Sequence, residues 1–402
     1  MPATLPSPVN ARAILDDGAL PPAGDPRAEA FAFPRALGPT GGLAQREAAQ
    51  RRSAIRKATA DARHLTTNNA QRDCGRRLAK PSDPLEFWYI RTDPPTDSPQ
   101  RPRDVGAAAF NLRTCSRVWS CPHCEAVAAA RVARWAGDAI RQAHHRGYVT
   151  HHLTLTLQHH PGTPLQDAHT QFRAVLRHFW NARATKAAYG GRPVGRLTAI
   201  EITHGIYGWH LHAHLLTFGT TAPDTDALRA QWTRSASLCG QYASPAHGAT
   251  MRAVSEADTI AHYVTATAHG TADAPAKRAH AESHTLAQIL ALAAQGHPLM
   301  RRLWGEVDAL ARVTRWKVEH GTCQALGMLP PAEHSVQSTD CTLAFALAPA
   351  DAQELLRWHG DAMDEILDRI ADDDAAGALS IIRHRLGRDF YLVTDDSHPP
   401  PM

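Results

Sequence analysis

The sequence predicts an α+β protein in which an antiparallel sheet has helices on one face, follows a cysteine-rich module and precedes a helical C-terminal region. Three observations support this prediction. Strand-like segments with alternating apolar and polar residues are interleaved with helical segments between residues 147 and 272. Two of these strands are separated only by a short turn that contains Gly205 and Gly208. Four cysteines lie before residue 125.

The composition is that of a globular protein. The 402 residues, 43% of them hydrophobic, suffice for two or three domains. No segment approaches the roughly 20 apolar residues that span a bilayer. The residues MPATLPSPVNAR lack the apolar stretch of a secretory signal. We therefore expect a cytoplasmic protein that does not enter a membrane.

The charge distribution is compatible with a nucleic-acid partner but does not establish one. The net charge is only +4, with arginine-rich segments at 46–57, 72–77 and 101–103 and an acidic segment at 362–374. A basic N-terminal third suits contacts with phosphates. Solvated protein surfaces rich in arginine are also common, so both interpretations stay open.

Four regions are expected along the chain. They are a disordered leader at 1–45, a basic cysteine-rich module at 46–146, a sheet domain at 147–272 and a helical region at 273–402. The module ends in a helix over 122–146. The sheet domain should contain strands at 148–158, 195–205, 208–219 and 249–255 and helices at 164–188, 223–240 and 256–269. After a linker at 270–282, helices are expected at 283–296 and 298–318.

Three histidines alternate along the strand 208–219. Residues two apart in a strand point to the same side, so His210, His212 and His214 should share one face while the apolar residues between them share the other. Neutral imidazoles on one face can converge on a divalent metal. With 25 histidines in 402 residues, one His-x-His pair would carry little weight. Three in alternation opposite an apolar face favour a metal site.

Glu201 is the carboxylate that can accompany them. It lies on the preceding strand between Ile200 and Ile202, which point the other way, and across the turn it reaches the level of the histidines. An unpaired charge among apolar neighbours is costly to bury, so Glu201 should have a partner. The alternative is an exposed hairpin residue.

The four early cysteines have the spacing of a zinc site. Cys74 and Cys115 are followed by Cys121 and Cys124, which form a C-x-x-C motif directly before the predicted helix. Zinc would supply folding free energy to the segment 66–120, which has little apolar material of its own. His123 is a competing ligand, and a redox C-x-x-C motif is a competing function.

Tyr263 lies on the helix predicted to follow the sheet. Glu256 is seven residues earlier and faces the same way, whereas Asp258 is nearby but off that face. A phenol needs a base or a metal-polarised phosphate to act as a nucleophile at neutral pH. A tyrosine that only packs against the sheet is the alternative.

Several blocks of this sequence resemble the motifs of one superfamily. The segments TLTLQHHPGTPL and RLTAIEITHGIYGWHLHAHLLTF and the helix with Tyr263 resemble the three motifs of rolling-circle replication initiators from bacterial plasmids. These are HUH endonucleases, and the chain is most similar to initiators of high-GC actinobacterial-type plasmids. The upstream TCSRVWSCPHC and the downstream SHTLAQILALAAQGHPLMRRLWGEVDALARVTRW resemble further segments of those proteins. The resemblance covers roughly 70–320.

The resemblance implies a palm-like, ferredoxin-like antiparallel sheet and a reaction. His212 and His214, with Glu201 as third ligand and His210 beside them, would bind Mg²⁺ or Mn²⁺. Tyr263 would attack the scissile phosphate and leave a 5′-phosphotyrosine and a 3′-OH primer. Either Glu256 or Asp258 would activate the water that ends the cycle.

The implied partners are plasmid origin DNA, as a single strand or a hairpin, together with a host helicase and polymerase. A structural Zn²⁺ would be held by the four early cysteines.

The sequence departs from the superfamily pattern at two positions. Leu211 replaces a proline found between the histidines of many relatives, which leaves the ligands intact. Ala266 stands where a lysine often follows the tyrosine, so a cation near the phosphate is missing unless Lys277 or Arg278 supplies it.

Three other functions stay open at this point. A transposase of the same chemistry typically carries two tyrosines on the catalytic helix, whereas only Tyr263 is present here. A zinc-stabilised DNA-binding regulator without catalysis stays open because of Ala266. A metal-dependent hydrolase of small molecules would need a second group of carboxylates beside the histidines.

Overall fold

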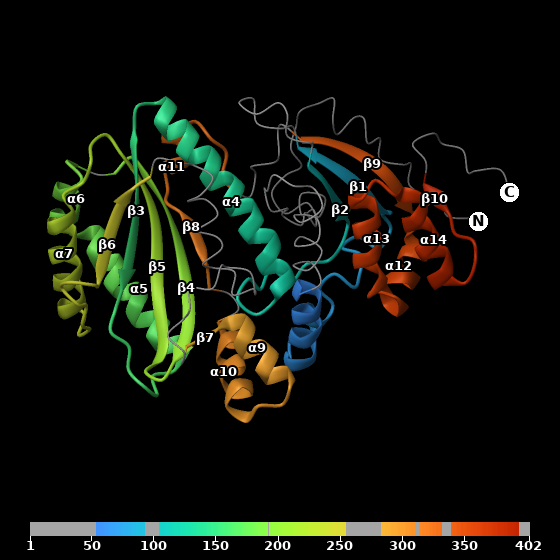
Figure 1. The fold of residues 1–402 in the computed structure, drawn as a ribbon, viewed down its shortest axis with the longest axis horizontal. Coiled ribbons are helices and arrows are strands. Elements are labelled where there is room, and N and C mark those ends of the chain that lie inside the picture. Colours follow the sequence, from blue (N-terminus) through green and yellow to red (C-terminus); the bar gives the residue numbers. More distant parts are fainter. Residues whose placement is uncertain are drawn as a thin grey trace. The chain divides into compact units, whose positions relative to one another are not determined.

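The computed structural model describes residues 54–92, 104–191, 193–254, 283–310, 313–331 and 339–393. The chain divides into two compact units (Figure 1). The first unit comprises 1–57, 66–116 and 335–402, and the second comprises 58–65 and 117–334. The expected leader at 1–45 lies outside the described residues. The two units differ from the consecutive regions expected from the sequence, because the first unit is assembled from both ends of the chain.

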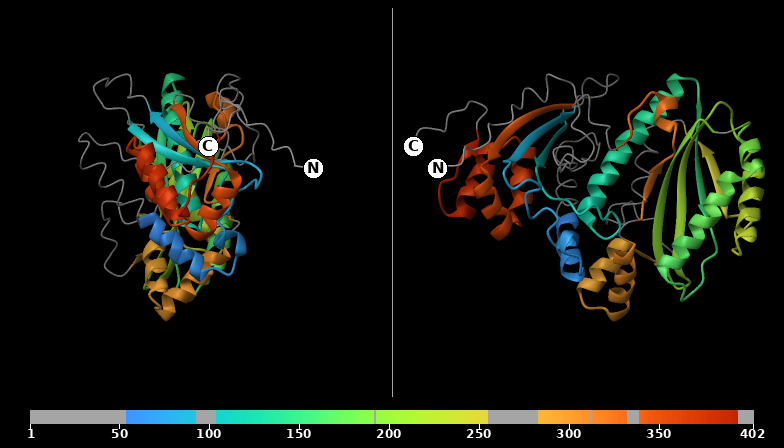
Figure 2. Two further views of the ribbon diagram at one scale, coloured as in Figure 1. Left: turned by 90° about the vertical axis from the view of Figure 1, so that its right-hand side faces the viewer. Right: turned by 180° about the vertical axis from the view of Figure 1, so that it is seen from behind.

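A four-stranded antiparallel sheet forms the centre of the first unit. Its strand order is β10-β9-β1-β2. The strands are β1 (Leu85–Thr92), β2 (Asp104–Phe110), β9 (Thr339–Leu347) and β10 (Leu392–Val393). The helices are α3 (Asn69–Arg72), α12 (Pro349–Trp358), α13 (Ala362–Ala371) and α14 (Ala375–Leu386). Figure 2 shows β9 beside β1 in the view from behind, as their pairing requires.

The C-terminal part of the chain completes the core of the first unit. Leu85 and Leu347 are opposite each other and fully buried, and the rings of Phe87 and Phe345 lie 4.8 Å apart. Segment 66–120 was expected to have little apolar material of its own. In the structure, apolar residues of α12–α14 and β9 complete its core. The C-terminal helices are confirmed, whereas β9 and β10 were not predicted.

The second unit contains a six-stranded antiparallel sheet. Its order is β6-β3-β5-β4-β7, and β8 also pairs with β4. The strands are β3 (Val149–Thr156), β4 (Gly195–Gly205), β5 (Gly208–Gly219), β6 (Ala249–Ala253), β7 (His284–Thr285) and β8 (Trp316–Val318). The two hairpin strands have the bounds that the sequence predicts.

The helices of the second unit lie on both faces of its sheet. They are α4 (Pro122–His145), α5 (Leu165–Asn181), α6 (Arg183–Ala188), α7 (Thr225–Leu238), α9 (Leu286–Ala294), α10 (Pro298–Ala309) and α11 (Thr322–Leu326). Residues of α5 and α7 pack on the face that carries Leu211, Ala213 and Leu215. Residues of α4 pack on the opposite face, against Leu216 and Phe218 (Figure 1). The described helices within 147–272 therefore lie on one face, as the sequence predicts, whereas α4, which was expected in the preceding module, covers the other face.

Two expected helices end early. The helix expected at 164–188 breaks at Ala182, whose backbone is extended, and continues as α6. The helix expected at 298–318 stops at Ala309, and Trp316–Val318 instead form β8. The edge of β4 offers unpaired backbone groups there, and β8 satisfies them by pairing with Leu197–Ala199. Among the described helices, none combines the length and the apolar character that a membrane crossing requires.

The turn between β4 and β5 depends on a glycine. Gly208 has φ +89°, and a Cβ at this position would lie 2.7 Å from the carbonyl oxygen of His160. A larger residue would therefore be strained and would also collide with the loop that follows β3. The turn thus fixes the register of the hairpin, in which Gly205 pairs with Gly208.

The core beneath the sheet contains a buried imidazole on α5. His169 is 3% exposed. Burial lowers the pKa of His169 to about 4, and Arg173 acts in the same direction. In the unfolded chain a histidine titrates near 6.5, so the unfolded state takes up the proton first. The stability that this group contributes is complete above about pH 6.5 and is lost as the pH falls towards about 4.

Replacing His169 by Leu should reduce the loss of stability in acid, because it removes this proton uptake. Between about pH 7 and about pH 5 the melting temperature of the His169→Leu variant should fall less than that of the wild type. The exposed His247 offers a matched control, and His247→Leu should keep the wild-type fall. Thermal unfolding followed by circular dichroism measures both. An equal fall in wild type and His169→Leu would contradict the assignment.

Candidate functional site

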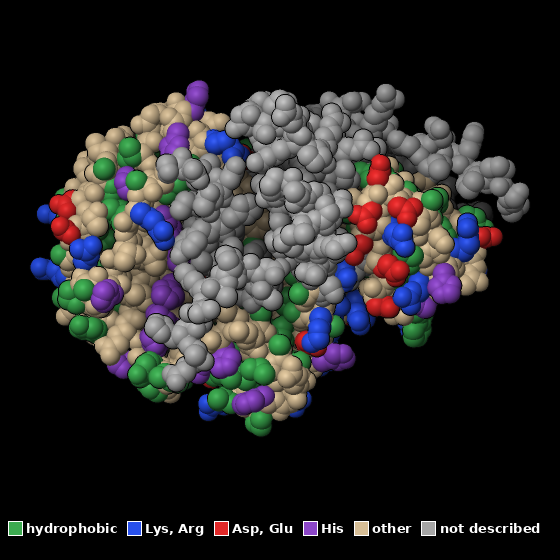
Figure 3. Space-filling model, in the orientation of Figure 1, with side chains coloured by type: hydrophobic (Ala, Val, Ile, Leu, Met, Phe, Trp, Pro, Cys, Tyr) green, Lys and Arg blue, Asp and Glu red, His purple; other side chains and the backbone are tan. Residues whose placement is uncertain are grey.

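The three histidines of β5 lie on one face of the sheet. Leu211 and Ala213, which alternate with them, are buried in the core on the other face. On the histidine face, His212 is directly opposite Glu201 of β4 and Thr156 of β3. Figure 3 shows histidine side chains gathered at the surface over β3 and β5. The alternation in the sequence therefore places the candidate ligands as expected.

Glu201 and His214 are in direct contact. Nε2 of His214 lies 2.9 Å from Oε2 of Glu201, and the two side chains are 3% and 18% exposed. Because a carboxylate only accepts, Nε2–H of His214 is the donor in this hydrogen bond. On the other side of the ring, Oγ1 of Thr154 lies 3.4 Å from Nδ1. Glu201 is therefore not simply an exposed hairpin residue.

His210 occupies a different environment on the same strand. Its Nε2 lies 2.9 Å from Oγ1 of Thr156. Burial lowers the pKa of His210 to about 3, and the neighbouring His212 and His159 act in the same direction. The ring is therefore neutral at physiological pH. The His210 and His212 rings are 4.0 Å apart, and the His212 and His214 rings are 6.1 Å apart.

Two further histidines belong to this face and were missed by the sequence analysis. His152 of β3 is 1% exposed and stacks on His214 with ring centroids 5.5 Å apart. His159 follows β3 and stacks on His210 at 4.3 Å. The signal for His152 was present in the segment THHLTLT, because its alternation puts His152 on the same face as Thr154 and Thr156.

The histidine face places a carboxylate beside imidazoles, which are donor types that divalent metals take. Two ligand atoms at about 2.1 Å from one metal and at right angles lie about 3.0 Å apart. The 2.9 Å between His214 and Glu201 matches this separation. Within the described ranges, the cysteines alone bring three or more ligand atoms within 4.8 Å of one another. A metal on the histidine face would therefore require the His212 ring to turn towards the Glu201–His214 pair.

Helix α4 packs on the apolar half of this face. Its residues Trp135 and Ile140 belong to one cluster with Leu197 and Phe218. On the half that carries the histidines, His214 and His152 are 2% and 1% exposed. The face therefore has an apolar half, which packs against the helix, and a polar half with buried imidazoles.

The described chain ends after β6 and begins again at β7, both of which belong to this sheet. Val254, directly after β6, is buried in the cluster that α4 forms on this face. At the other end, His284 and Thr285 of β7 pair with His204 and Thr203 of β4. The segment between these points carries Tyr263, Glu256 and Asp258. These three residues lie outside the described residues, as do Ala266, Lys277 and Arg278.

The four early cysteines form a buried cluster. Their sulfur atoms all lie within 4.8 Å of one another, and Cys74, Cys121 and Cys124 are buried while Cys115 is half-buried. A tetrahedral zinc with Zn–S bonds of about 2.3 Å places its sulfurs about 3.8 Å apart. The cluster is therefore compatible with a structural zinc site. His123, the competing ligand, is not part of the described cluster, and a redox pair would need only two of the four sulfurs.

Local backbone structure brings the cysteines together. The amide of Gly75 donates to the carbonyl of Arg113, and the amide of Arg113 donates to that of Arg77, each at 2.8 Å. This pairing aligns the segments that carry Cys74 and Cys115. Cys121 is the N-cap of α4, and Cys124 lies in its first turn, so the C-x-x-C motif is held by the start of the helix.

A buried ion pair ties the start of α4 to the edge of the sheet. The Arg315 guanidinium donates to Glu125 at 2.7 Å, and their side chains are 2% and 12% exposed. Burial raises the pKa of the Glu125 carboxyl, and Arg315 acts in the opposite direction. The carbonyl of Arg315 also accepts from the amide of Ile200, the neighbour of Glu201 in β4. Removing one partner of such a pair typically costs about 3–5 kcal/mol.

A scan against protein-family models and searches of curated proteins and of solved structures found no match to this chain.

Substitution of the cluster cysteines should remove bound zinc. The double variant Cys121→Ser and Cys124→Ser loses two thiolates, so zinc per chain in freshly purified protein should fall from about one to near zero. Cys239 lies outside the cluster at the end of α7, and Cys239→Ser should keep the zinc. Elemental analysis measures all three proteins. Wild-type protein purified without zinc or another thiophilic metal would refute the site.

Proposed function

We propose that the chain is a metal-dependent endonuclease and strand transferase of the HUH type that nicks single-stranded DNA and initiates rolling-circle replication of a plasmid. The observation that carries this proposal is the histidine face. It holds Glu201 against His214, and His212 lies directly opposite Glu201. The order of the sequence motifs around this face supports the same function.

In this proposal His212, His214 and Glu201 hold Mg²⁺ or Mn²⁺. The bound metal supplies positive charge that polarises the scissile phosphate. Thr154 lies at the far nitrogen of His214, and His152 packs on its ring. These contacts orient His214 in the way that outer partners orient metal-binding histidines. Nε2 of His210 is within hydrogen-bond distance of Oγ1 of Thr156, so in this proposal His210 packs beside His212 and does not bind the metal.

Tyr263 is the proposed nucleophile. Its phenolic oxygen gives up its proton and attacks the phosphorus, the bond from phosphorus to the 3′ oxygen breaks, and that oxygen takes a proton. The products are a 5′-phosphotyrosine and a 3′-OH that can prime synthesis. Tyr263 follows Val254, which is buried on the histidine face, by nine positions in the sequence. Glu256 or Asp258 is the proposed base for the water that ends the cycle.

The proposed partners follow from this chemistry. The substrate is single-stranded or hairpin DNA at a plasmid origin, and the exposed 3′-OH requires a polymerase and a helicase of the host. A structural zinc in the cysteine cluster would stabilise the start of α4. A DNA-binding regulator without catalysis would bind DNA but would not cut it.

Loss of the Glu201–His214 pair should weaken metal binding on this face. His214→Ala and Glu201→Gln should each weaken Mn²⁺ binding by at least about tenfold, as for a lost ligand, and should abolish Mn²⁺-dependent nicking. DNA affinity should change little, because phosphate contacts elsewhere dominate it. The exposed His247 is the control, and His247→Ala should bind Mn²⁺ and nick as the wild type does. Wild-type nicking by His214→Ala would remove the assignment.

Tyr263→Phe separates catalysis from packing, because it deletes only the hydroxyl. Its free energy of unfolding should stay within ~1 kcal/mol of the wild-type value, the usual worth of one hydrogen bond. Nicking should vanish. The exposed Tyr391 offers a control, and Tyr391→Phe should nick at the wild-type rate. A purely structural tyrosine would give the reverse pattern, with activity retained in Tyr263→Phe.

A further inference from the structure

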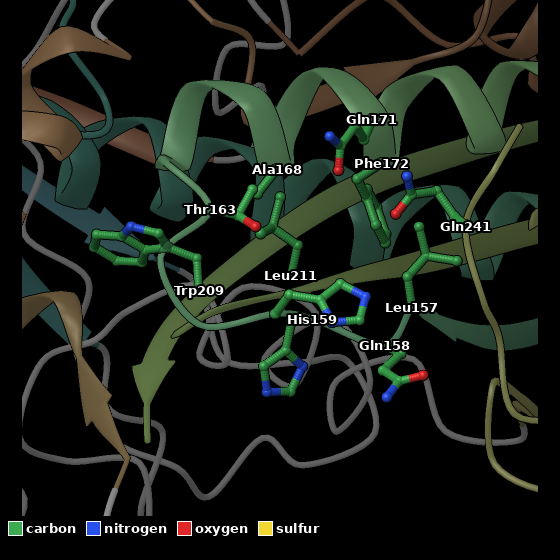
Figure 4. Close-up of a pocket in the computed structure, with 11 residues that line it drawn as sticks. Leu157, Gln158, His159, Thr163, Ala168, Gln171, Phe172, Trp209, Leu211 and Gln241 are labelled. Carbon is green, nitrogen blue, oxygen red and sulfur yellow. The ribbon is translucent and has the colours of Figure 1, made fainter. Parts of the chain in front are cut away.

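Strand β6, at one edge of the six-stranded sheet, carries an arginine on the histidine face. Arg252 is directly opposite His152 of β3, and residues opposite each other in paired strands have their side chains on the same side of the sheet. His152 in turn stacks on His214. The other side of the sheet is the core, where Leu211 of β5 lies with Phe172 of α5 (Figure 4). Arg252 therefore shares a face with the proposed metal ligands.

Arg252 is the one residue with a permanent positive charge that the described strands of this sheet place on the histidine face. These strands contain two others, Arg196 of β4 and Lys317 of β8. Arg196 lies four residues before Ile200, which is buried in the core, and therefore belongs to the core face. Lys317 is opposite Thr198, two residues before Ile200, and belongs to the core face as well. A phosphate at the histidine face would therefore find its strand-borne cation in Arg252.

The register of the strands also gives the distance between Arg252 and His214. Strand β3 lies between their strands, so the two backbones are about 10 Å apart at about 4.8 Å per strand spacing. Along the strands the offset is about 7 Å, because their partners in β3, His152 and Thr154, are two residues apart. The two Cα atoms are therefore about 12 Å apart. At this distance the guanidinium suits a phosphate next to the one that a metal on His214 would hold.

The chemistry of an exposed arginine matches such a phosphate. Arg252 is exposed at the edge of the sheet. A guanidinium is always charged, and its fork of N–H donors matches two phosphate oxygens. A single DNA strand carries a negative charge on every phosphate, so a strand with one phosphate at the metal presents further phosphates on either side of it. Strand β6 also leads, through Val254, into the segment that carries Tyr263.

We propose that Arg252 binds a backbone phosphate of single-stranded DNA next to the phosphate held at the metal, and so holds the strand across the histidine face. The proposal rests on the proposed function for the identity of the substrate as single-stranded DNA. It assigns the edge strand β6 to the DNA-binding surface and separates a residue that binds the strand from the residues that would cut it.

Binding of labelled oligo(dT) by the full-length protein, without added Mg²⁺ or Mn²⁺, tests this contact independently of nicking. Fluorescence anisotropy gives the affinity between about 0.05 and about 0.2 M salt. One phosphate contact contributes about 0.7 to the slope of log affinity against log salt for a single strand. Arg252→Gln should therefore reduce this slope by about 0.7, so that its loss of affinity grows about 2.6-fold from the highest to the lowest salt. An unchanged slope, or no binding of DNA by the wild type, would overturn the proposal.

Two further variants show whether position or net charge is responsible. Arg252→Lys keeps the positive charge and should keep the wild-type slope. Arg234 is an exposed arginine on α7, which packs on the core face, and Arg234→Gln should also keep the wild-type slope. An equal reduction in Arg234→Gln and Arg252→Gln would refute the site. Because Arg252 is exposed, Arg252→Gln should melt at the wild-type temperature, which thermal unfolding checks.

Nicking kinetics with Mn²⁺ separate binding of the strand from the chemical step. The contacted phosphate is not the one that is cleaved, so Arg252→Gln should raise KM for the oligonucleotide by the same factor as it weakens binding and should leave kcat close to the wild-type value. Arg252→Lys should restore KM. A fall in kcat with an unchanged KM would contradict the proposed contact.

The outcomes for Arg252 and for the proposed function are distinguishable. If Arg252→Gln reduces the salt slope while the wild type never nicks DNA, the phosphate contact stands and the endonuclease does not. If the wild type nicks DNA but Arg252→Gln keeps both the salt slope and KM, the endonuclease stands and the phosphate contact does not.

Discussion

The register of the β4–β5 hairpin is the constraint on which the candidate site depends. The side-chain period of a strand is two, so a slip of one residue would move every histidine into the core and every core residue to the histidine face. The turn prevents this slip, because Gly208 adopts φ +89° against the carbonyl of His160. That register places Glu201 opposite His212 and within hydrogen-bond distance of His214. The conformation of Gly208 thus helps to decide which side chains of the hairpin enter the core and which lie on the histidine face.

The position of α4 depends on contacts at its start and along its length. The helix buries the apolar half of the histidine face, where Trp135 and Ile140 pack with Leu197 and Phe218. The start of α4 is fixed twice, by the cysteines in its first turn and by the buried Arg315–Glu125 pair. Because the backbone of Arg315 also binds that of Ile200, the position of α4 is coupled to the strand that carries Glu201.

Local patterns in the sequence predicted much of the second unit. Alternation and a glycine turn sufficed for the hairpin, because that signal lies within a few residues. The C-x-x-C motif likewise indicated the cysteine cluster, although Cys74 lies about 50 residues before Cys124. Long-range pairing was not predictable in this way. Strand β9 pairs with β1 across more than half of the chain, and β8 forms because β4 has an edge to pair. His152 was missed because its role depends on the pairing of β3 with β5, which places it beside His214.

The central claim is that the histidine face serves a tyrosine that becomes linked to DNA. The most direct test is incubation of the wild-type protein with labelled single-stranded origin DNA and Mn²⁺, followed by a denaturing gel and peptide mapping. We expect a metal-dependent covalent adduct whose DNA is attached to Tyr263. An adduct on another residue would contradict the catalytic assignment, and the absence of any adduct under conditions in which the protein binds the DNA would contradict the enzyme class.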